Sequence, residues 1–321
     1  MIKARLFLVL KGMAMGMAEV VPGVSGGTIA FITGIYERLI NVIKSIGPGL
    51  FTAFKKDGIP GVWKAVDGNF LVTLISGMVV GIVIGVFLIT HLLETYPLLV
   101  WSYFFGLIMV SAWFVGKQII QVNGQVIFMA TLGACIAYYI TVAVPVAGNP
   151  ELWYVFVCGA IAVSALLLPG ISGSFILLLL GMYTYIIPTV KNAIKTFEID
   201  KIIVLIAFGS GMLVGMIAFS RVISWAFANF KDLTLAALTG FLIGSLNKIW
   251  PWQQVLQTME KDRGELVIIH SRSDLPATFA KIELNPIYGN DPQILGCVLL
   301  IAAGFATVFV AEQLSSKLSS E

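Results

Sequence analysis

Two short segments of this chain combine proline, glycine and hydroxyl residues within apolar surroundings. Residues 22–28 read PGVSGGT, and residues 169–174 read PGISGS. Proline cannot continue a helix, and glycine lets a backbone turn and approach a ligand closely. Serine caps a helix that begins beside it, and the free N–H groups of a first helical turn attract anions. The pattern therefore predicts two helix breaks with the chemistry of an anion site.

The composition places these breaks in a membrane. Of the 321 residues, 58% are hydrophobic and 12% are charged, whereas a soluble domain is about one-quarter charged. Lys11 interrupts the first apolar run, so we expect no cleavable signal peptide. A helix break inside a bilayer is tolerated where it is buried in protein or lines a polar cavity. We therefore expect a multi-pass membrane protein in which both breaks are buried.

The apolar segments predict two hinged pairs and six full spans. Each full span reaches about the 20 residues that a bilayer requires. Residues 250–292 form the one long polar stretch, which we interpret as an outer loop. The predicted hairpins cover 5–43 and 152–188, and the predicted spans cover 70–93, 98–116, 125–145, 202–227, 233–249 and 293–312.

An internal repeat organises these segments. Pro22 and Pro169 lie 147 residues apart, and the same offset pairs the other motif residues. The following spans pair at an offset of 134, so the loop at 44–69 carries the 13 extra residues of the first copy. The last spans match weakly, with Gln125 opposite Gln293. We therefore expect a first repeat at 1–147 and a second repeat at 148–321.

The number of membrane crossings decides the symmetry. If each hinged pair is a re-entrant hairpin, each copy crosses three more times and the second copy is inverted; if the pairs span fully, the copies are parallel. Basic residues gather on the predicted cytoplasmic side in the inverted arrangement, with both termini cytoplasmic. We therefore favour an all-α polytopic membrane protein with two inverted-topology repeats, each a re-entrant helical hairpin plus three transmembrane helices.

The two hairpin tips are the candidate binding site. Glycine and proline there could serve packing and kinking alone. Their duplication at matched places, each time with hydroxyls at a helix start, instead favours two tips that converge on one anion. The candidate ligands are Ser25, Gly26, Gly27, Thr28, Ser172, Gly173 and Ser174.

Three charged residues extend this hypothesis. Glu19 precedes the first motif in apolar surroundings; it could fix the hairpin through an ion pair, or act in proton coupling or gating. Arg38 could extend to the lipid headgroups or bind a phosphate at the mouth of the cavity. Arg221 interrupts an apolar span where the other repeat has Phe87, which suggests a ligand on that side.

Residues 18–30 and 168–174 resemble the DUF368 family of bacterial membrane proteins, and the similarity covers essentially the whole chain. This family is similar in role to the DedA family and is implicated in polyprenyl-phosphate transport. The resemblance implies that undecaprenyl phosphate returns from the outer to the cytoplasmic leaflet of the plasma membrane. The second hairpin departs from the first because Ser174 and Phe175 replace Gly27 and Thr28, so the tips need not bind equivalently.

Composition and repeats alone indicate an anion-binding membrane protein; the resemblance implies a flippase of the bacterial inner membrane whose substrate is a polyprenyl phosphate lipid, with the headgroup between the two hairpin tips. A transporter or channel for a small, phosphate-like anion is the alternative. An intramembrane lipid phosphatase is disfavoured because neither His91 nor His270 lies near a motif. We therefore expect that the protein is not an enzyme. We expect no metal, no cofactor and no nucleic-acid partner. A coupling proton or sodium ion and a homo-oligomer remain open.

Overall fold

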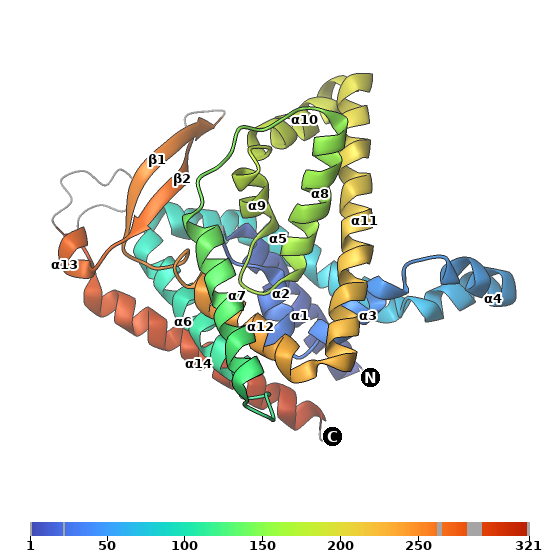
Figure 1. Ribbon diagram of the computed structural model, residues 1–321, viewed down its shortest axis with the longest axis horizontal. Coiled ribbons are helices and arrows are strands. Elements are labelled where there is room, and N and C mark those ends of the chain that lie inside the picture. The colour runs from blue at the N-terminus through green and yellow to red at the C-terminus, as the bar shows by residue number, and fades with distance from the viewer. Residues whose placement is uncertain (1, 22, 262–264, 281–290, 320–321) are drawn as a thin grey trace. The chain divides into compact units, whose positions relative to one another are not determined.

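The computed structural model describes residues 2–21, 23–261, 265–280 and 291–319 (Figure 1), so Pro22 of the first motif lies outside the described residues. The chain forms two compact units, Met1–Gly85 with Val146–Thr234, and Val86–Pro145 with Leu235–Glu321. Each unit combines corresponding segments of both predicted repeats. The duplicated hairpins therefore belong to the same unit.

The first unit contains both hairpins, each built from three helices. Its second helix is short in both copies, and the third leaves the tip in a new direction. The bounds are α1 (Ile2–Val20), α2 (Gly26–Ile32), α3 (Tyr36–Ser45), α4 (Gly49–Ala65), α5 (Gly68–Thr95), α8 (Leu152–Leu167), α9 (Gly173–Leu179), α10 (Tyr183–Thr196) and α11 (Ile199–Asn229). The segment 44–69, which the sequence predicts to be mainly a surface loop, is largely the helix α4, kinked at Gly58.

The second unit holds the remaining helices and a small sheet. The bounds are α6 (Pro97–Gly116), α7 (Gly124–Val142), α12 (Lys231–Ser245), β1 (Gln253–Lys261), β2 (Glu265–Ser273), α13 (Pro276–Phe279) and α14 (Ile294–Ser319). β1 and β2 pair antiparallel, so part of the predicted outer loop is a β-hairpin. Buried Trp252 anchors its base, because its indole N–H donates to the Pro292 carbonyl over 2.8 Å.

The helix lengths confirm a multi-pass membrane protein. Among the described residues, α5, α6, α7 and α11 are long and apolar enough to cross a bilayer. The apolar part of α14, Ile294–Val310, is shorter, and α12 has 15 residues. Helix α9 and the residues Tyr183–Val190 of α10 bend by 117°, as in a broken or re-entrant span. Many large apolar side chains of these helices are exposed, which suits contact with lipid.

Glycine residues allow close contacts between helices of the first unit, and equivalent contacts occur in both repeats. A Cβ atom at Gly77 of α5 would lie 2.3 Å from the Val9 carbonyl oxygen of α1. The equivalent Gly211 of α11 would place a Cβ atom 2.0 Å from the Phe156 carbonyl oxygen of α8. Val9 and Phe156 are themselves 147 residues apart. Helices α1 and α5 therefore pack as α8 and α11 do, through small residues.

The second unit extends this correspondence to the last spans. Gly133 of α7 faces the carbonyl oxygen of Ala237, while Gly304 of α14 faces that of Tyr103. Tyr103 and Ala237 obey the offset of 134 found in the sequence. Gly133 and Gly304 therefore correspond, at an offset of 171 residues instead of the 168 that separates Gln125 from Gln293.

Candidate functional site

The two copies of the sequence motif meet directly, because hydrogen bonds join the first hairpin tip to the second hairpin. The Ser25 hydroxyl donates to the Leu166 carbonyl at the end of α8 over 2.9 Å. In return, the Gly170 backbone N–H donates to the Thr28 hydroxyl oxygen over 2.9 Å. Ser25 and Thr28 are both fully buried. The convergence of the tips that the sequence suggests is therefore present within the first unit, and hydroxyls of one tip hold it.

A third hydrogen bond ties the outgoing arm of the first hairpin to the same place. The Tyr36 hydroxyl donates to the Leu167 carbonyl over 2.8 Å, and both residues are buried. The Tyr36 ring packs against Phe31 and Phe227, with ring centroids 4.9 and 6.1 Å away. Tyr36 thus connects the joined tips to helix α11, which carries Phe227. The repeat pairs Tyr36 with Tyr183 at the offset of 147, but we assigned this tyrosine no contact from the sequence.

Backbone N–H groups of the first tip are also hydrogen-bonded within the first hairpin. The Ser25 hydroxyl oxygen caps α2 by accepting from the Gly27 N–H over 3.0 Å. A Glu19 carboxylate oxygen accepts from the Gly26 N–H over 2.6 Å. The acidic side chain therefore occupies a donor of the turn where an external anion would bind. Of the two interpretations of Glu19, this contact favours one in which the residue fixes the hairpin.

The second tip lacks this acid. Leu166 stands 147 residues after Glu19, so the start of α9 has a leucine where α2 has a carboxylate. Ser172 precedes α9 but makes no side-chain cap, and its hydroxyl lies 2.8 Å from that of Ser174. Ser174 is exposed, whereas Ser172 and Gly173 are buried. The second tip therefore carries an accessible hydroxyl and no negative charge of its own.

The two candidate arginines lie away from this hydrogen-bond network. Arg38 donates to one Asp67 carboxylate oxygen from Nε over 2.8 Å and from a terminal nitrogen over 2.6 Å. Its guanidinium also lies 4.3 Å from the Phe70 ring centroid. Arg221 is exposed on α11, where a Cβ atom at Gly47 would lie 2.7 Å from its guanidinium. The tips and the arginines are thus separate groups of residues.

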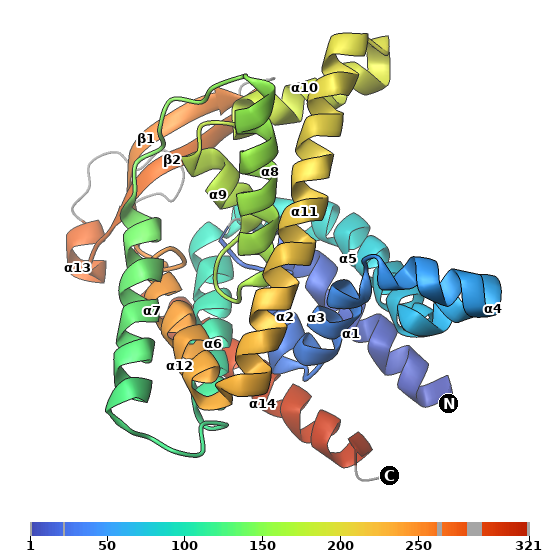
Figure 2. The same ribbon diagram turned by 45° about the vertical axis from the view of Figure 1, so that its right-hand side comes forward.

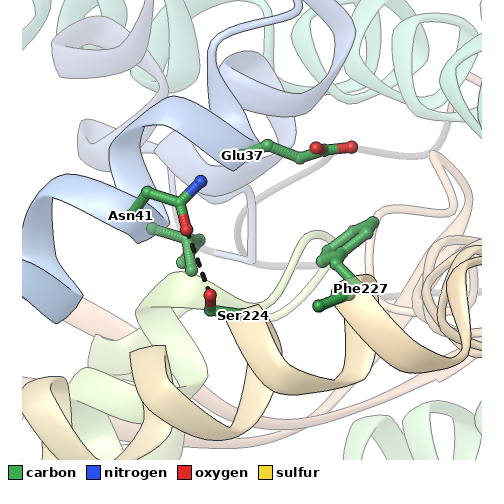
Figure 3. A pocket seen from close by; sticks show the side chains of 6 residues that line it. Glu37, Asn41, Ser224 and Phe227 are labelled. Carbon is green, nitrogen blue, oxygen red and sulfur yellow. Dashed lines mark hydrogen bonds between the residues drawn. The ribbon is translucent and has the colours of Figure 1, made fainter.

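A polar pocket between α3 and α11 is a feature that our sequence analysis missed. It has a volume of about 160 Å³ and is lined by Glu37, Ile40, Asn41, Ser224, Phe227 and Ala228 (Figure 3). The Ser224 hydroxyl donates to the Asn41 side-chain oxygen over 3.0 Å, and Lys44 donates to Ser224 over 3.0 Å. Asn41 and Lys44 are three residues apart on α3, as are Arg221 and Ser224 on α11. This spacing puts each pair on one helix face, but it does not show that the two faces meet.

No metal centre accompanies these groups in the part of the chain that the structure describes. There, no three His, Cys, Asp or Glu side chains come together as ligands. The polar chemistry of the first unit therefore consists of hydroxyls, amides and a few charged side chains.

Comparison with known proteins identifies relatives over most of the chain. Residues 15–267 match the VCA0040-like family, which is described as undecaprenyl phosphate translocase-like. A polyprenyl-phosphate transporter of Vibrio cholerae is 44% identical over 92% of this chain and 92% of its own length. A polyprenyl-phosphate transporter of Staphylococcus aureus is 31% identical over 76% of this chain and 85% of its own. No solved structure matches the chain.

Proposed function

Because the chain belongs to the VCA0040-like, undecaprenyl phosphate translocase-like family, we propose that it moves a polyprenyl phosphate from the outer to the cytoplasmic leaflet of the bacterial plasma membrane. The observation that carries the proposal is the direct joining of two broken-helix tips within an apolar helical unit. Such breaks line substrate sites in many secondary transporters. The phosphate is the group that needs this help, because a charge in the hydrocarbon layer is costly.

We assign the headgroup contacts to the second tip. The first tip already uses its hydroxyls and two of its amides within the protein, so Ser25, Gly26, Gly27 and Thr28 shape the site. Ser172, Gly173 and Ser174 face no carboxylate of their own and include the exposed hydroxyl. A hydrogen bond to a charged group contributes about 1.5–3 kcal/mol. Hydrogen bonds from the two serine hydroxyls would therefore stabilise a phosphate bound here.

Support for the inverted arrangement comes from helix α11. Ile186 of α10 and Val204 near the start of α11 belong to one buried cluster. Asn41 of α3 contacts Ser224, which follows Val204 by 20 residues, or about 30 Å at 1.5 Å per residue. The equivalent arms α3 and α10 therefore pack on opposite ends of one helix (Figure 2). This opposite direction is what two inverted hairpins joined at their tips require.

This arrangement gives the transporter two faces that are related by pseudo-symmetry. The headgroup site at the joined tips would then lie between the two ends of α11. The prenyl tail stays in lipid, beside the exposed apolar side chains of the spanning helices. Only the phosphate needs to pass the joined tips.

The test uses purified protein in liposomes with a labelled undecaprenyl phosphate that is accessible at one leaflet. We expect the wild-type protein to transfer the lipid faster than empty liposomes. The double variant Ser172→Ala/Ser174→Ala should transfer it about tenfold or more slowly, since about 1.4 kcal/mol corresponds to a factor of ten. Its thermal unfolding should match that of the wild type.

Liposomes loaded with inorganic phosphate distinguish the alternative function. Wild-type protein that releases phosphate but leaves the lipid in its original leaflet would establish a small-anion transporter. Equal lipid transfer by wild-type and empty liposomes would contradict the proposed function itself.

A further inference from the structure

The pocket between α3 and α11, defined above by its six lining residues, has the composition of a second anion site. Two polar side chains, Asn41 and Ser224, face each other across it, and Glu37 and Phe227 extend from the same two helices (Figure 3). The Asn41 oxygen is held by Ser224, which turns the amide nitrogen of Asn41 away from that contact. The pocket thus presents the amide nitrogen of Asn41, whose side chain is held in place through its oxygen.

Three cations lie near this frame, on α3, on α11 and at the start of α12. The Lys44 ammonium group lies 3.0 Å from the Ser224 hydroxyl. Arg221, three residues before Ser224, has its guanidinium beside Gly47, which follows Lys44 by three residues. Lys231 lies 3.9 Å from the Glu37 carboxylate, the one acidic group that lines the pocket. Lys231 is paired with Glu37, while Lys44 and Arg221 make no ion pair among the described residues, so they leave a positive charge beside the pocket that suits an anion.

We propose that this α3–α11 pocket binds a phosphate monoester, as a second station for the lipid headgroup at one end of α11. The inference rests on the proposed function for its choice of lipid, but its geometry is independent of the hairpin tips. The Lys44 ammonium and the Asn41 amide can donate to the acceptor oxygens of a phosphate, and Arg221 adds a guanidinium nearby, whereas the Ser224 hydroxyl proton is already used by Asn41. Charge-assisted bonds of this kind are about twice as strong as neutral ones.

A lipid is the favoured source of the phosphate because the pocket opens beside an apolar face. Ile40 and Phe227 form part of its wall. Near it on α11, the large side chains Val222 and Trp225 are exposed, as expected for residues that contact lipid. A headgroup in the pocket could therefore keep its tail in the bilayer.

The pocket is also connected to the joined tips. Phe227, which lines it, packs against Tyr36, whose hydroxyl bonds to Leu167 beside the tips. Asn41 follows Tyr36 by five residues on α3, about 7.5 Å along the helix. The pocket therefore lies next to the tips along the first hairpin, where a headgroup leaving the tips would find the next group of donors. On the predicted topology this is the cytoplasmic side.

The test measures binding to full-length protein in detergent by two probes, undecaprenyl phosphate and inorganic phosphate. The variant Lys44→Gln/Arg221→Gln removes two cations at exposed positions and should keep the fold. We expect it to weaken binding of both probes about tenfold or more, since about 1.4 kcal/mol corresponds to a factor of ten. Lys56→Gln, an exposed lysine on α4, is the matched control and should bind both like the wild type.

The outcomes separate this inference from the proposed function. Weakened binding of phosphate with unchanged binding of the lipid would overturn the lipid assignment. Unchanged binding of both probes would overturn the site. If wild-type protein fails to move the lipid between leaflets but the double variant still loses both probes, the proposed function fails and the pocket stands as a phosphate site. A second variant, Asn41→Leu, should weaken both probes while leaving the charge unchanged.

Discussion

The two hairpin tips share a backbone and differ in chemistry. Gly23 and Gly170 both adopt the left-handed region, with φ angles of 84° and 88°, which favours glycine over other residues. Around that common turn, the first tip has Glu19 and Thr28, while the second has Leu166 and Phe175 at the matched positions. The first tip therefore forms hydrogen bonds within its own hairpin and to the second hairpin, whereas the second tip has an exposed serine, Ser174. The two tips thus share a turn, while their side chains differ: those of the first tip hold the structure, and we propose that those of the second bind the ligand.

The largest expected effect is a loss of folded protein when the glycine contacts between helices are disrupted. Comparing the two copies tests whether they depend equally on these contacts. In Gly211→Leu and Gly77→Leu, the new side chain would meet a backbone carbonyl oxygen at 2.0 and 2.3 Å. Overpacking typically costs about 1–3 kcal/mol, and here a whole helix must move. We expect both variants to lose most of the folded, detergent-extracted protein.

The control for these variants lies on α11, the helix that carries Gly211. A Cβ atom at Gly209 has no neighbour within 4 Å, so Gly209→Leu should yield folded protein at nearly the wild-type level. Size-exclusion chromatography measures all three. A folded Gly77→Leu beside an unfolded Gly211→Leu would show that the copies differ in their packing as well as at their tips.

The second prediction concerns the hydrogen bond that runs between the tips. Thr28→Val removes the buried acceptor of the Gly170 N–H while keeping the shape of the side chain. An orphaned buried donor costs about 1–3 kcal/mol, so the midpoint of thermal unfolding should fall. Thr33→Val is the control, because the Thr33 hydroxyl bonds to Ile29 within its own hairpin segment. If Thr28→Val unfolds at the same temperature as Thr33→Val, the bond between the tips does not stabilise the fold.

The sequence predicts the large features of this arrangement better than its individual side-chain contacts. Apolar runs and repeat offsets predicted the helices and the meeting of the tips, since both follow from lengths and symmetry. They could not predict that the Ser25 hydroxyl would reach the Leu166 carbonyl, because that depends on the rotation of one helix end against another. The partner of Arg38 was hidden for the same reason: Asp67 is 29 residues away, beyond a helix whose fold the sequence does not fix.

Two further features could not be predicted from the sequence: the pocket between α3 and α11, and the β-hairpin. Ser224 and Asn41 are 183 residues apart, so only packing brings them together. The β-hairpin pairs two strands within a polar stretch whose composition is typical of a loop. Strand pairing depends on contacts across the turn, which a local reading of hydropathy does not capture.

The third prediction compares the two cap positions directly. The Ser25 hydroxyl caps α2 and donates to Leu166, so Ser25→Ala should cost about 0.5–2 kcal/mol. Ser172 makes no side-chain cap, so Ser172→Ala should stay within about 0.5 kcal/mol of wild type. Thermal unfolding in detergent measures both. Equal losses at the two positions would mean that the tips share the structural role and that the division between them is wrong.

The smallest expected change in stability concerns Arg38, and it tests the role of this residue. Arg38 occurs in the first hairpin alone, because the matched position of the second hairpin is Tyr185. The structure pairs Arg38 with Asp67, and their side chains are 56% and 38% exposed. Exposed ion pairs contribute about 0–1 kcal/mol and are screened by salt. Arg38→Gln should therefore lower the unfolding midpoint slightly in dilute buffer, with the difference shrinking in concentrated salt. Because the guanidinium is already bonded to a carboxylate, lipid transfer should stay near the wild-type rate. A strong loss of transfer, with Asp67→Asn transferring normally, would instead mean that Arg38 leaves its partner to bind the phosphate, as the sequence alone suggested.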